Sequence, residues 1–246
     1  LKGAALLEKI HLRQPQHPGV SHYHIHLYDY PAIAEKGIDA ARRYAKIAPD
    51  APHALHMPAH IFTRVGYWKE SIASNTASAN AAKESKEWDD QLHGMDYLVY
   101  AYLQLGEDQN ARKIVDQMEK VTDYKRFAGH YAFAASSARF VVERGEWKQA
   151  AELQVRSSPF AYADAMPQFA RALGAARSGQ LGAADADIAT QDAGRFFLED
   201  AAIGIPIDHQ RGGEQQAQHS DHQAADPEQK TVHPRHILGF RSDQSR

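Results

Sequence analysis

Histidines recur at helical spacing in the stretch PHALHMPAHIFTRVG, which covers residues 52–66. At about 100° per residue, His53, His56 and His60 fall within about 60° of one another, so they project from one face of a helix. A face that packs in a core should be apolar, whereas this face is polar. Imidazole binds divalent metals and also donates or accepts hydrogen bonds, so the row indicates a ligand or metal site.

The next candidate helix carries a similar row. Three positions match when residues are counted back from Gly66 and Gly106, which end the two segments: His53 with His93 at 13 residues, His56 with Asp96 at 10, and His60 with Tyr100 at 6. Helices packed in a stack lie about 10 Å apart, close enough for imidazole and carboxylate side chains to converge. We therefore expect these side chains to meet between the two helices.

Metal binding is one chemistry that this set of residues suits. Zn²⁺ takes three or four nitrogen or oxygen ligands at about 2 Å, and two ligands one helical turn apart plus others from a facing helix can supply them. The chain has no cysteine, so a metal would need His, carboxylate or carbonyl ligands. The predicted metal ligands are His53, His56, His60, His93 and Asp96, and zinc is the favoured divalent metal.

Residues on the flanking helices are predicted to contact a bound ligand. His22 and His26 are four residues apart and share a helical face, whereas His24 points about 160° away from His22. Tyrosines on the second helix could donate hydrogen bonds to a substrate or to a developing oxyanion. The predicted ligand-binding residues are His22, His26, Tyr97, Tyr100 and His130.

The histidine rows leave several functions open. One is a binding module whose groove holds a peptide or protein segment, a small molecule or a metal. Another is a metal-dependent hydrolase of a small ester or lactone, in which metal-bound water with a pKa near about 7 attacks the carbonyl, with His93, Asp96 and Tyr100 as catalytic candidates. A metal carrier or sensor, a hydrogen-bonded structural layer and a pH sensor also fit.

Pro58 should kink the helix and could turn His53 and His56 away from His60.

Four glycines divide the chain into similar segments. The glycines, at positions 66, 106, 145 and 179, are separated by 40, 39 and 34 residues. Each follows a segment with helical apolar periodicity, and glycine at the end of a helix can adopt positive φ. The predicted first helices are 18–29, 52–65, 88–105, 126–144 and 161–178, and their partners are 31–48, 67–84, 107–121, 146–156 and 181–199. Paired helices at this period predict an all-α fold, a superhelical solenoid of about five antiparallel hairpins.

Two of the segment junctions share a pattern of small and aromatic residues. RVGYWKESIASN and ERGEWKQAAELQ place Gly before an aromatic or acidic residue and Ala a few positions later. The chain resembles the tetratricopeptide repeats over roughly residues 1–195. The strings HPGVSHYHIHLYDYP, PHALHMPAHIF and LHGMDYLVYAYLQ also resemble a bacterial subgroup with histidine-rich groove helices. The resemblance implies a right-handed solenoid with the first helix of each pair lining a concave groove; it does not imply an enzyme.

Composition narrows the possible partners and compartment. The formal charge of −3, with mixed signs, argues against nucleic acid or an anionic membrane as a partner, and no run of 18 apolar residues is present. No secretory signal is visible, so the cytoplasm is expected by default. LKGAALLEKIHLRQP has the character of the second helix of a hairpin, which suggests an N-terminal truncation. We expect a repeat domain over residues 1–200 and a polar, disordered tail over 207–246.

Overall fold

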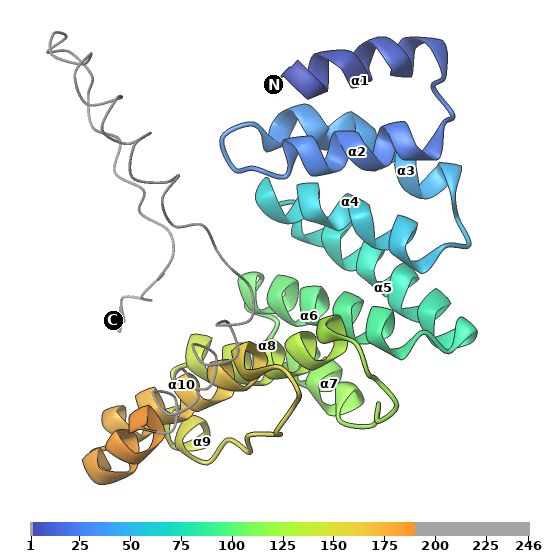
Figure 1. Ribbon diagram of the computed structural model, residues 1–246. Helices are drawn as coiled ribbons and strands as arrows, with labels where there is room; N and C mark the ends of the chain where they lie inside the picture. The colour runs from blue at the N-terminus through green and yellow to red at the C-terminus, as the bar shows by residue number, and fades with distance from the viewer. Residues whose placement is uncertain (1, 190–246) are drawn as a thin grey trace, which may run out of the picture. The chain divides into compact units, whose positions relative to one another are not determined.

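The computed structural model of the protein describes residues 2–189, and all regular secondary structure in this range is helical (Figure 1). The helices are α1 (Lys2–Arg13), α2 (Pro18–Tyr28), η1 (Ala34–Gly37), α3 (Ile38–Ile47), α4 (Pro52–Arg64), α5 (Trp68–Ser85), α6 (Trp88–Gln104), α7 (Asp108–Met118), α8 (Phe127–Glu143), α9 (Trp147–Ala151) and α10 (Ala161–Arg177). Residues 181–189 are helical as well. The all-α prediction is confirmed.

The five predicted first helices correspond to α2, α4, α6, α8 and α10, with ends that agree within one or two residues. The partner helices differ more. The first partner begins as the 3₁₀ helix η1 before continuing as α3, and α9 has only five residues where residues 146–156 were expected. Helix α9 ends at Ala151, well before Pro159, which disfavours helical backbone only at Ser158 and so does not explain the early end. The fifth predicted partner, 181–199, is helical as far as residue 189, beyond which it lies outside the described residues.

Glycine ends four of the helical segments in the same way. Gly66, Gly106, Gly145 and Gly179 have φ values of 75°, 71°, 69° and 79°. After each glycine, the next residue donates its backbone N–H to the carbonyl five residues earlier, at 2.8–3.0 Å. This is the Schellman arrangement, in which a left-handed residue satisfies the last carbonyls of a helix. The predicted role of these glycines is confirmed, and each turn sends the chain back along the helix just completed.

Contacts in the described part of the chain run mainly between neighbours in sequence. Each hairpin packs its two helices together, as α4 with α5 and α6 with α7, and successive first helices also contact one another, from α2 to α10. Contacts of this kind are what a stack of helical hairpins requires. The curvature and handedness of the predicted solenoid stay predictions.

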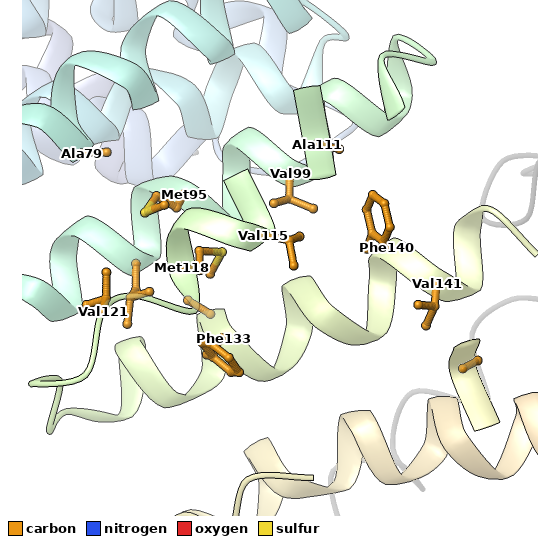
Figure 2. Close-up of a cluster of buried hydrophobic side chains, with 13 residues drawn as sticks. Ala79, Met95, Val99, Ala111, Val115, Met118, Val121, Phe133, Phe140 and Val141 are labelled. Atoms are coloured by element: carbon orange, nitrogen blue, oxygen red, sulfur yellow. The ribbon is translucent and has the colours of Figure 1, made fainter. Parts of the chain in front are cut away.

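The buried apolar side chains form two clusters. The N-terminal core joins α1, α2, α3 and α4 and comprises Ala4, Ile25, Tyr28, Ala40, Ala41, Tyr44, Ala54, Met57, Ile61 and Phe62. The central core joins α5 to α9 (Figure 2) and comprises Ala79, Leu92, Met95, Val99, Ala111, Val115, Met118, Val121, Ala132, Phe133, Phe140, Val141 and Ala150. Helix α4 therefore belongs to one core and its hairpin partner α5 to the other.

The interface between α4 and α5 is lined by small and polar side chains. Ser74 Oγ donates to the carbonyl of Leu55 at 2.5 Å, and Ser78 Oγ donates to the carbonyl of Pro52 at 2.8 Å. The Ala- and Ser-rich helix α5 therefore packs directly on α4. The boundary between the two cores is thus held in part by hydrogen bonds.

None of the helices between residues 2 and 189 is long and apolar enough to cross a membrane. The predicted tail, 207–246, lies outside the described residues.

Candidate metal centre

Three histidines from two neighbouring first helices converge on one point. His56 and His60 come from α4 and His93 from α6, and one ring nitrogen from each lies within 4.8 Å of the others. The ring centroids of His56 and His93 are 4.3 Å apart. His56 is buried and the other two are half-buried. These three residues, called the histidine triad below, could hold a metal ion.

Pro58 does not separate the two histidines that flank it. Helix α4 continues from Pro52 to Arg64, and His56 Nε2 lies 3.0 Å from His60 Nε2. Pro58 is fully buried. It lies about 200° around the helix from His56, so its ring faces away from the imidazoles. The expected turning of His56 away from His60 is therefore wrong, and any distortion at Pro58 leaves their spacing intact.

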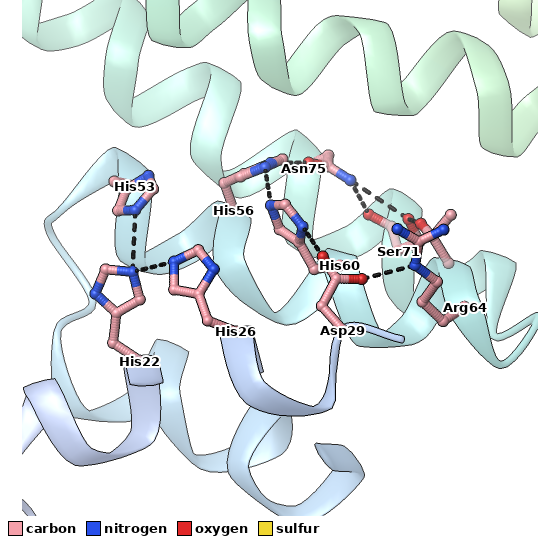
Figure 3. A network of polar contacts seen from close by, with 10 residues as sticks. His22, His26, Asp29, His53, His56, His60, Arg64, Ser71 and Asn75 are labelled. Carbon is pink, nitrogen blue, oxygen red and sulfur yellow. Dashed lines mark hydrogen bonds and ion pairs between the residues drawn. The ribbon is translucent and has the colours of Figure 1, made fainter. Parts of the chain in front are cut away.

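The proton of His56 is fixed by Asn75 of α5 (Figure 3). The amide nitrogen of Asn75 donates to the carbonyl of Ser71 at 2.9 Å, so its oxygen faces His56 Nδ1, which is 2.7 Å away. An amide oxygen only accepts, so His56 Nδ1 carries the hydrogen. The neutral ring of His56 then has its lone pair on Nε2, the atom that faces the triad.

The proton of His60 is fixed in the same way by Asp29, which follows the last residue of α2. His60 Nδ1 lies 2.9 Å from Asp29 Oδ2, and Arg64 Nε donates to Asp29 Oδ1 at 2.7 Å. Burial raises the pKa of Asp29, but the hydrogen bonds from His60 and Arg64 outweigh it and leave that pKa below its usual value. Asp29 is therefore a carboxylate that accepts the Nδ1 hydrogen of His60, so in the neutral form of this ring the lone pair is also on Nε2.

His56 Nε2 lies 3.0 Å from His60 Nε2. When both rings are neutral, two lone pairs face each other across this distance, and neither nitrogen has a proton to share. Burial holds the pKa of His56 well below its usual value, and the neighbouring His93 and His60 lower it further, so protonation is disfavoured there. A cation between the two atoms would satisfy both lone pairs. Histidine ligands whose second nitrogen is held by an amide or carboxylate are characteristic of metal sites.

Tyr97 covers the triad from α6. Its ring centroid lies 4.7 Å from that of His56, 5.4 Å from that of His60 and 5.5 Å from that of His93. Burial raises the pKa of the Tyr97 hydroxyl, so this group stays protonated and can act as a donor. Tyr97 was predicted to contact a ligand, and the structure places it against all three histidines.

Helix α6 lies about one turn out of the predicted register with α4. The ring of His93 lies near that of His56 and the ring of Tyr97 near that of His60, whereas the sequence comparison pairs His93 with His53 and Tyr100 with His60. Side chains on one helix pack between those of its neighbour, so equal distance from a turn does not put two residues opposite each other.

Asp96 faces away from the triad, towards α8. Its carboxylate accepts hydrogen bonds from Ser136 Oγ at 2.9 Å and from Arg139 at 2.5 Å. On the wheel of α6, Asp96 and Tyr97 lie about 60° and 40° to opposite sides of His93, so one faces α8 and the other faces α4. The structure thus gives Asp96 an ion pair that links α6 to α8, whereas the sequence had suggested it as a metal ligand.

The other predicted residues are distributed over several helices. His22, His26 and His53 form a separate group, in which His22 Nε2 contacts the other two rings. Tyr100 packs edge-on against Trp68 and beneath Arg139. His130 contacts the rings of Tyr124 and Phe160, and lines a small cavity beside α8 and α10. His24 is buried beside His11, facing away from His22 and His26 as predicted.

Sequence reasoning missed Asn75 and left Asp29 without a role. Asn75 is fully buried in the middle of α5, within a run of Ala, Ser and Thr. Asparagine is a poor helix former, so its presence at mid-helix was a signal that its side chain has a partner. The partner itself could not be identified without knowing which faces of α4 and α5 meet.

No family model, curated protein or solved structure matches this chain. The resemblance to tetratricopeptide repeats therefore stays a prediction.

Proposed function

We propose that this protein is a tetratricopeptide-like helical repeat protein that binds a divalent metal ion through His56, His60 and His93. The observation that carries the proposal is the convergence of one ring nitrogen from each of His56, His60 and His93, with 3.0 Å between His56 Nε2 and His60 Nε2. Asn75 and Asp29 hold the remaining hydrogen of each ring, at 2.7 and 2.9 Å, in the tautomer that a metal ligand needs. A purely structural hydrogen-bonded layer would instead place a hydrogen between the two Nε2 atoms.

Zinc is the metal that best suits three imidazoles. It accepts nitrogen ligands at about 2.0–2.1 Å in a tetrahedral arrangement, and ligand nitrogens around it are then a little over 3 Å apart. The 3.0 Å between His56 Nε2 and His60 Nε2 is close to this value. Three protein ligands leave a fourth position for water or for a group on a bound molecule.

Metal analysis of protein purified without a histidine tag tests the proposal. We expect tightly bound Zn²⁺ after dialysis, and a rise in melting temperature when Zn²⁺ is returned to chelator-treated protein. His93→Ala should remove this ion, whereas His130→Ala, which changes a histidine of α8 outside the triad, should retain it. Zinc that is retained equally by both variants, or absent from the wild type with no effect of added metal on melting, would contradict the proposal.

Hydrolysis of a small ester or lactone is the second candidate function, and the position of Tyr97 favours it. A bound zinc ion would lower the pKa of water in its fourth position and make hydroxide available near neutral pH. Tyr97 lies against all three ligand rings, and we propose that its protonated hydroxyl donates to a developing oxyanion. Zinc-dependent cleavage of a chromogenic ester that falls about 10-fold or more in Tyr97→Phe, with zinc content unchanged, would support this function. Cleavage that is unchanged in His93→Ala would refute it.

A further inference from the structure

A second group of histidines lies beside His56 and His60, between α2 and α4 (Figure 3). His22 Nε2 is 2.9 Å from His26 Nε2 and 3.4 Å from His53 Nε2. His22 and His26 are one turn apart on α2, and His53 comes from the first turn of α4. His26 and His53 are exposed, and His22 is half-buried.

The hydrogens available cannot satisfy both contacts of His22. A nitrogen of neutral imidazole carries either one hydrogen or one lone pair. If His22 Nε2 carries the hydrogen, that hydrogen can point at His26 or at His53 but not linearly at both; if it carries the lone pair, only one neighbour can donate to it in good geometry. One of the two close contacts is therefore left without a proper hydrogen bond.

The ring of His22 is held in place by aromatic neighbours. It lies nearly parallel to Tyr23 and to Tyr44, with centroids 5.6 Å away in both cases. His22 Nε2 therefore keeps its direction towards α4, while the exposed rings of His26 and His53 have room to turn about their side-chain bonds. The ring nitrogens of His22, His26 and His53 do not all lie within 4.8 Å of one another, so the two exposed rings would turn towards His22 to close around an ion.

We propose that His22, His26 and His53 form a second divalent-metal site, separate from the triad. Two histidines one turn apart on a helix bind transition metals as a chelating pair, and a third from a facing helix completes a set of three nitrogen ligands. The ligands are all imidazole, which favours Zn²⁺, Ni²⁺ and Cu²⁺ over Mg²⁺ and Ca²⁺.

The second site should bind metal more weakly and exchange it faster than the triad. No amide or carboxylate is seen to fix the tautomers of its exposed ligands in the part of the chain that the structure describes, in contrast to Asn75 and Asp29 at the triad. Its ligands also adjoin those of the triad, since ring centroids are 6.2 Å apart for His26 and His60 and 6.4 Å apart for His53 and His56. An ion held here lies next to the buried site.

The test is the stoichiometry of Zn²⁺ in untagged, chelator-treated protein, measured by titration against a chelating indicator. We expect two ions for each wild-type chain, the second with at least 10-fold lower affinity. His22→Ala should lose the weaker ion only, and His93→Ala should lose the tighter one only. His17→Ala, which removes an exposed histidine just before α2, should bind both ions. Circular dichroism of each variant checks that the helices are intact, and His22→Gln replaces His22→Ala if the latter unfolds.

The outcomes separate the two proposals. One ion per wild-type chain that is lost in His93→Ala and retained in His22→Ala would overturn the second site and leave the triad in place. One ion that is lost in His22→Ala and retained in His93→Ala would do the reverse. Two ions, both retained in His22→Ala, would place the weaker site elsewhere and overturn the inference.

Discussion

Replacement of Asn75 by alanine tests whether the triad is prepared for metal by its surroundings. Asn75 touches no ion in the proposed site, but its side-chain oxygen accepts the Nδ1 hydrogen of His56 at 2.7 Å. Without that acceptor, the hydrogen of His56 can move to Nε2, the atom that should bind the ion. The alanine variant would then bind zinc more weakly, because in part of the population Nε2 of His56 carries the hydrogen and has no lone pair for the ion.

The expected loss of zinc affinity at the triad is about 10-fold to 100-fold, the range usual for removal of a group that orients a metal ligand. This corresponds to roughly 1.4–2.7 kcal/mol. The metal-free variant should also lose about 1–3 kcal/mol of stability, because His56 Nδ1 and the carbonyl of Ser71 both lose a buried partner.

Ser78→Ala is the matched control. Ser78 lies on the same helix, is equally buried and donates to the carbonyl of Pro52 in α4 at 2.8 Å rather than to an imidazole. Its loss should lower stability by about 1 kcal/mol and leave zinc affinity unchanged. Urea denaturation of metal-free protein gives the stability, and competition with a chelating indicator gives the affinity. Equal zinc affinity in Asn75→Ala and wild type, or equal weakening in both variants, would show that the tautomer argument is wrong.

Three further results are expected. Asp96→Ala should lower the free energy of unfolding by about 1–3 kcal/mol, because Arg139 and Ser136 lose their hydrogen bonds to this buried carboxylate while Glu143 remains near Arg139. Zinc content should not change, and loss of zinc on analysis would restore Asp96 as a ligand. Burial lowers the pKa of His56, so below about pH 6.5 the unfolded chain binds more protons than the folded one. The free energy of unfolding of metal-free protein, measured in urea, should therefore fall as the pH is lowered below about 6.5. In His56→Gln it should change less steeply with pH. Gly174→Ala should unfold at a clearly lower temperature than Gly182→Ala. A Cβ added at Gly174 would lie 2.6 Å from the backbone oxygen of Trp147, whereas one added at Gly182 would meet nothing within 4 Å. Equal melting temperatures of the two variants would contradict this.

The helices could be predicted from the sequence because their signals are local. Each of the four turn glycines adopts the positive φ that its place after an apolar-periodic segment indicated, and the first helices begin and end within two residues of their expected bounds. Helix α9 was predicted too long, since a periodic pattern does not show where a loop with Pro159 takes over.

The site was harder to predict because it depends on contacts between elements. The helical wheel correctly put His56 and His60 on one face, but it gives only the angle of a side chain around its own helix. The one-turn offset between α4 and α6, which brings His93 to His56 and sends Asp96 to Arg139, depends on how the helices interlock. The roles of Asn75 and Asp29 depend on the same packing, since each comes from an element outside the two that supply the triad.

The boundary between the N-terminal and central cores has a consequence for how the chain unfolds. Helices α1 to α4 share one apolar cluster and α5 to α9 the other, and the seam at α4 and α5 is rich in serine hydrogen bonds. Repeat proteins whose neighbouring units are weakly coupled can lose one end while the rest stays folded. The triad takes two ligands from one side of this seam and the third from the other, so an ion bound there would clamp the halves together. Metal-free protein should then exchange the amide hydrogens of α1 to α4 ahead of the rest, and zinc should merge the two stages into one cooperative transition.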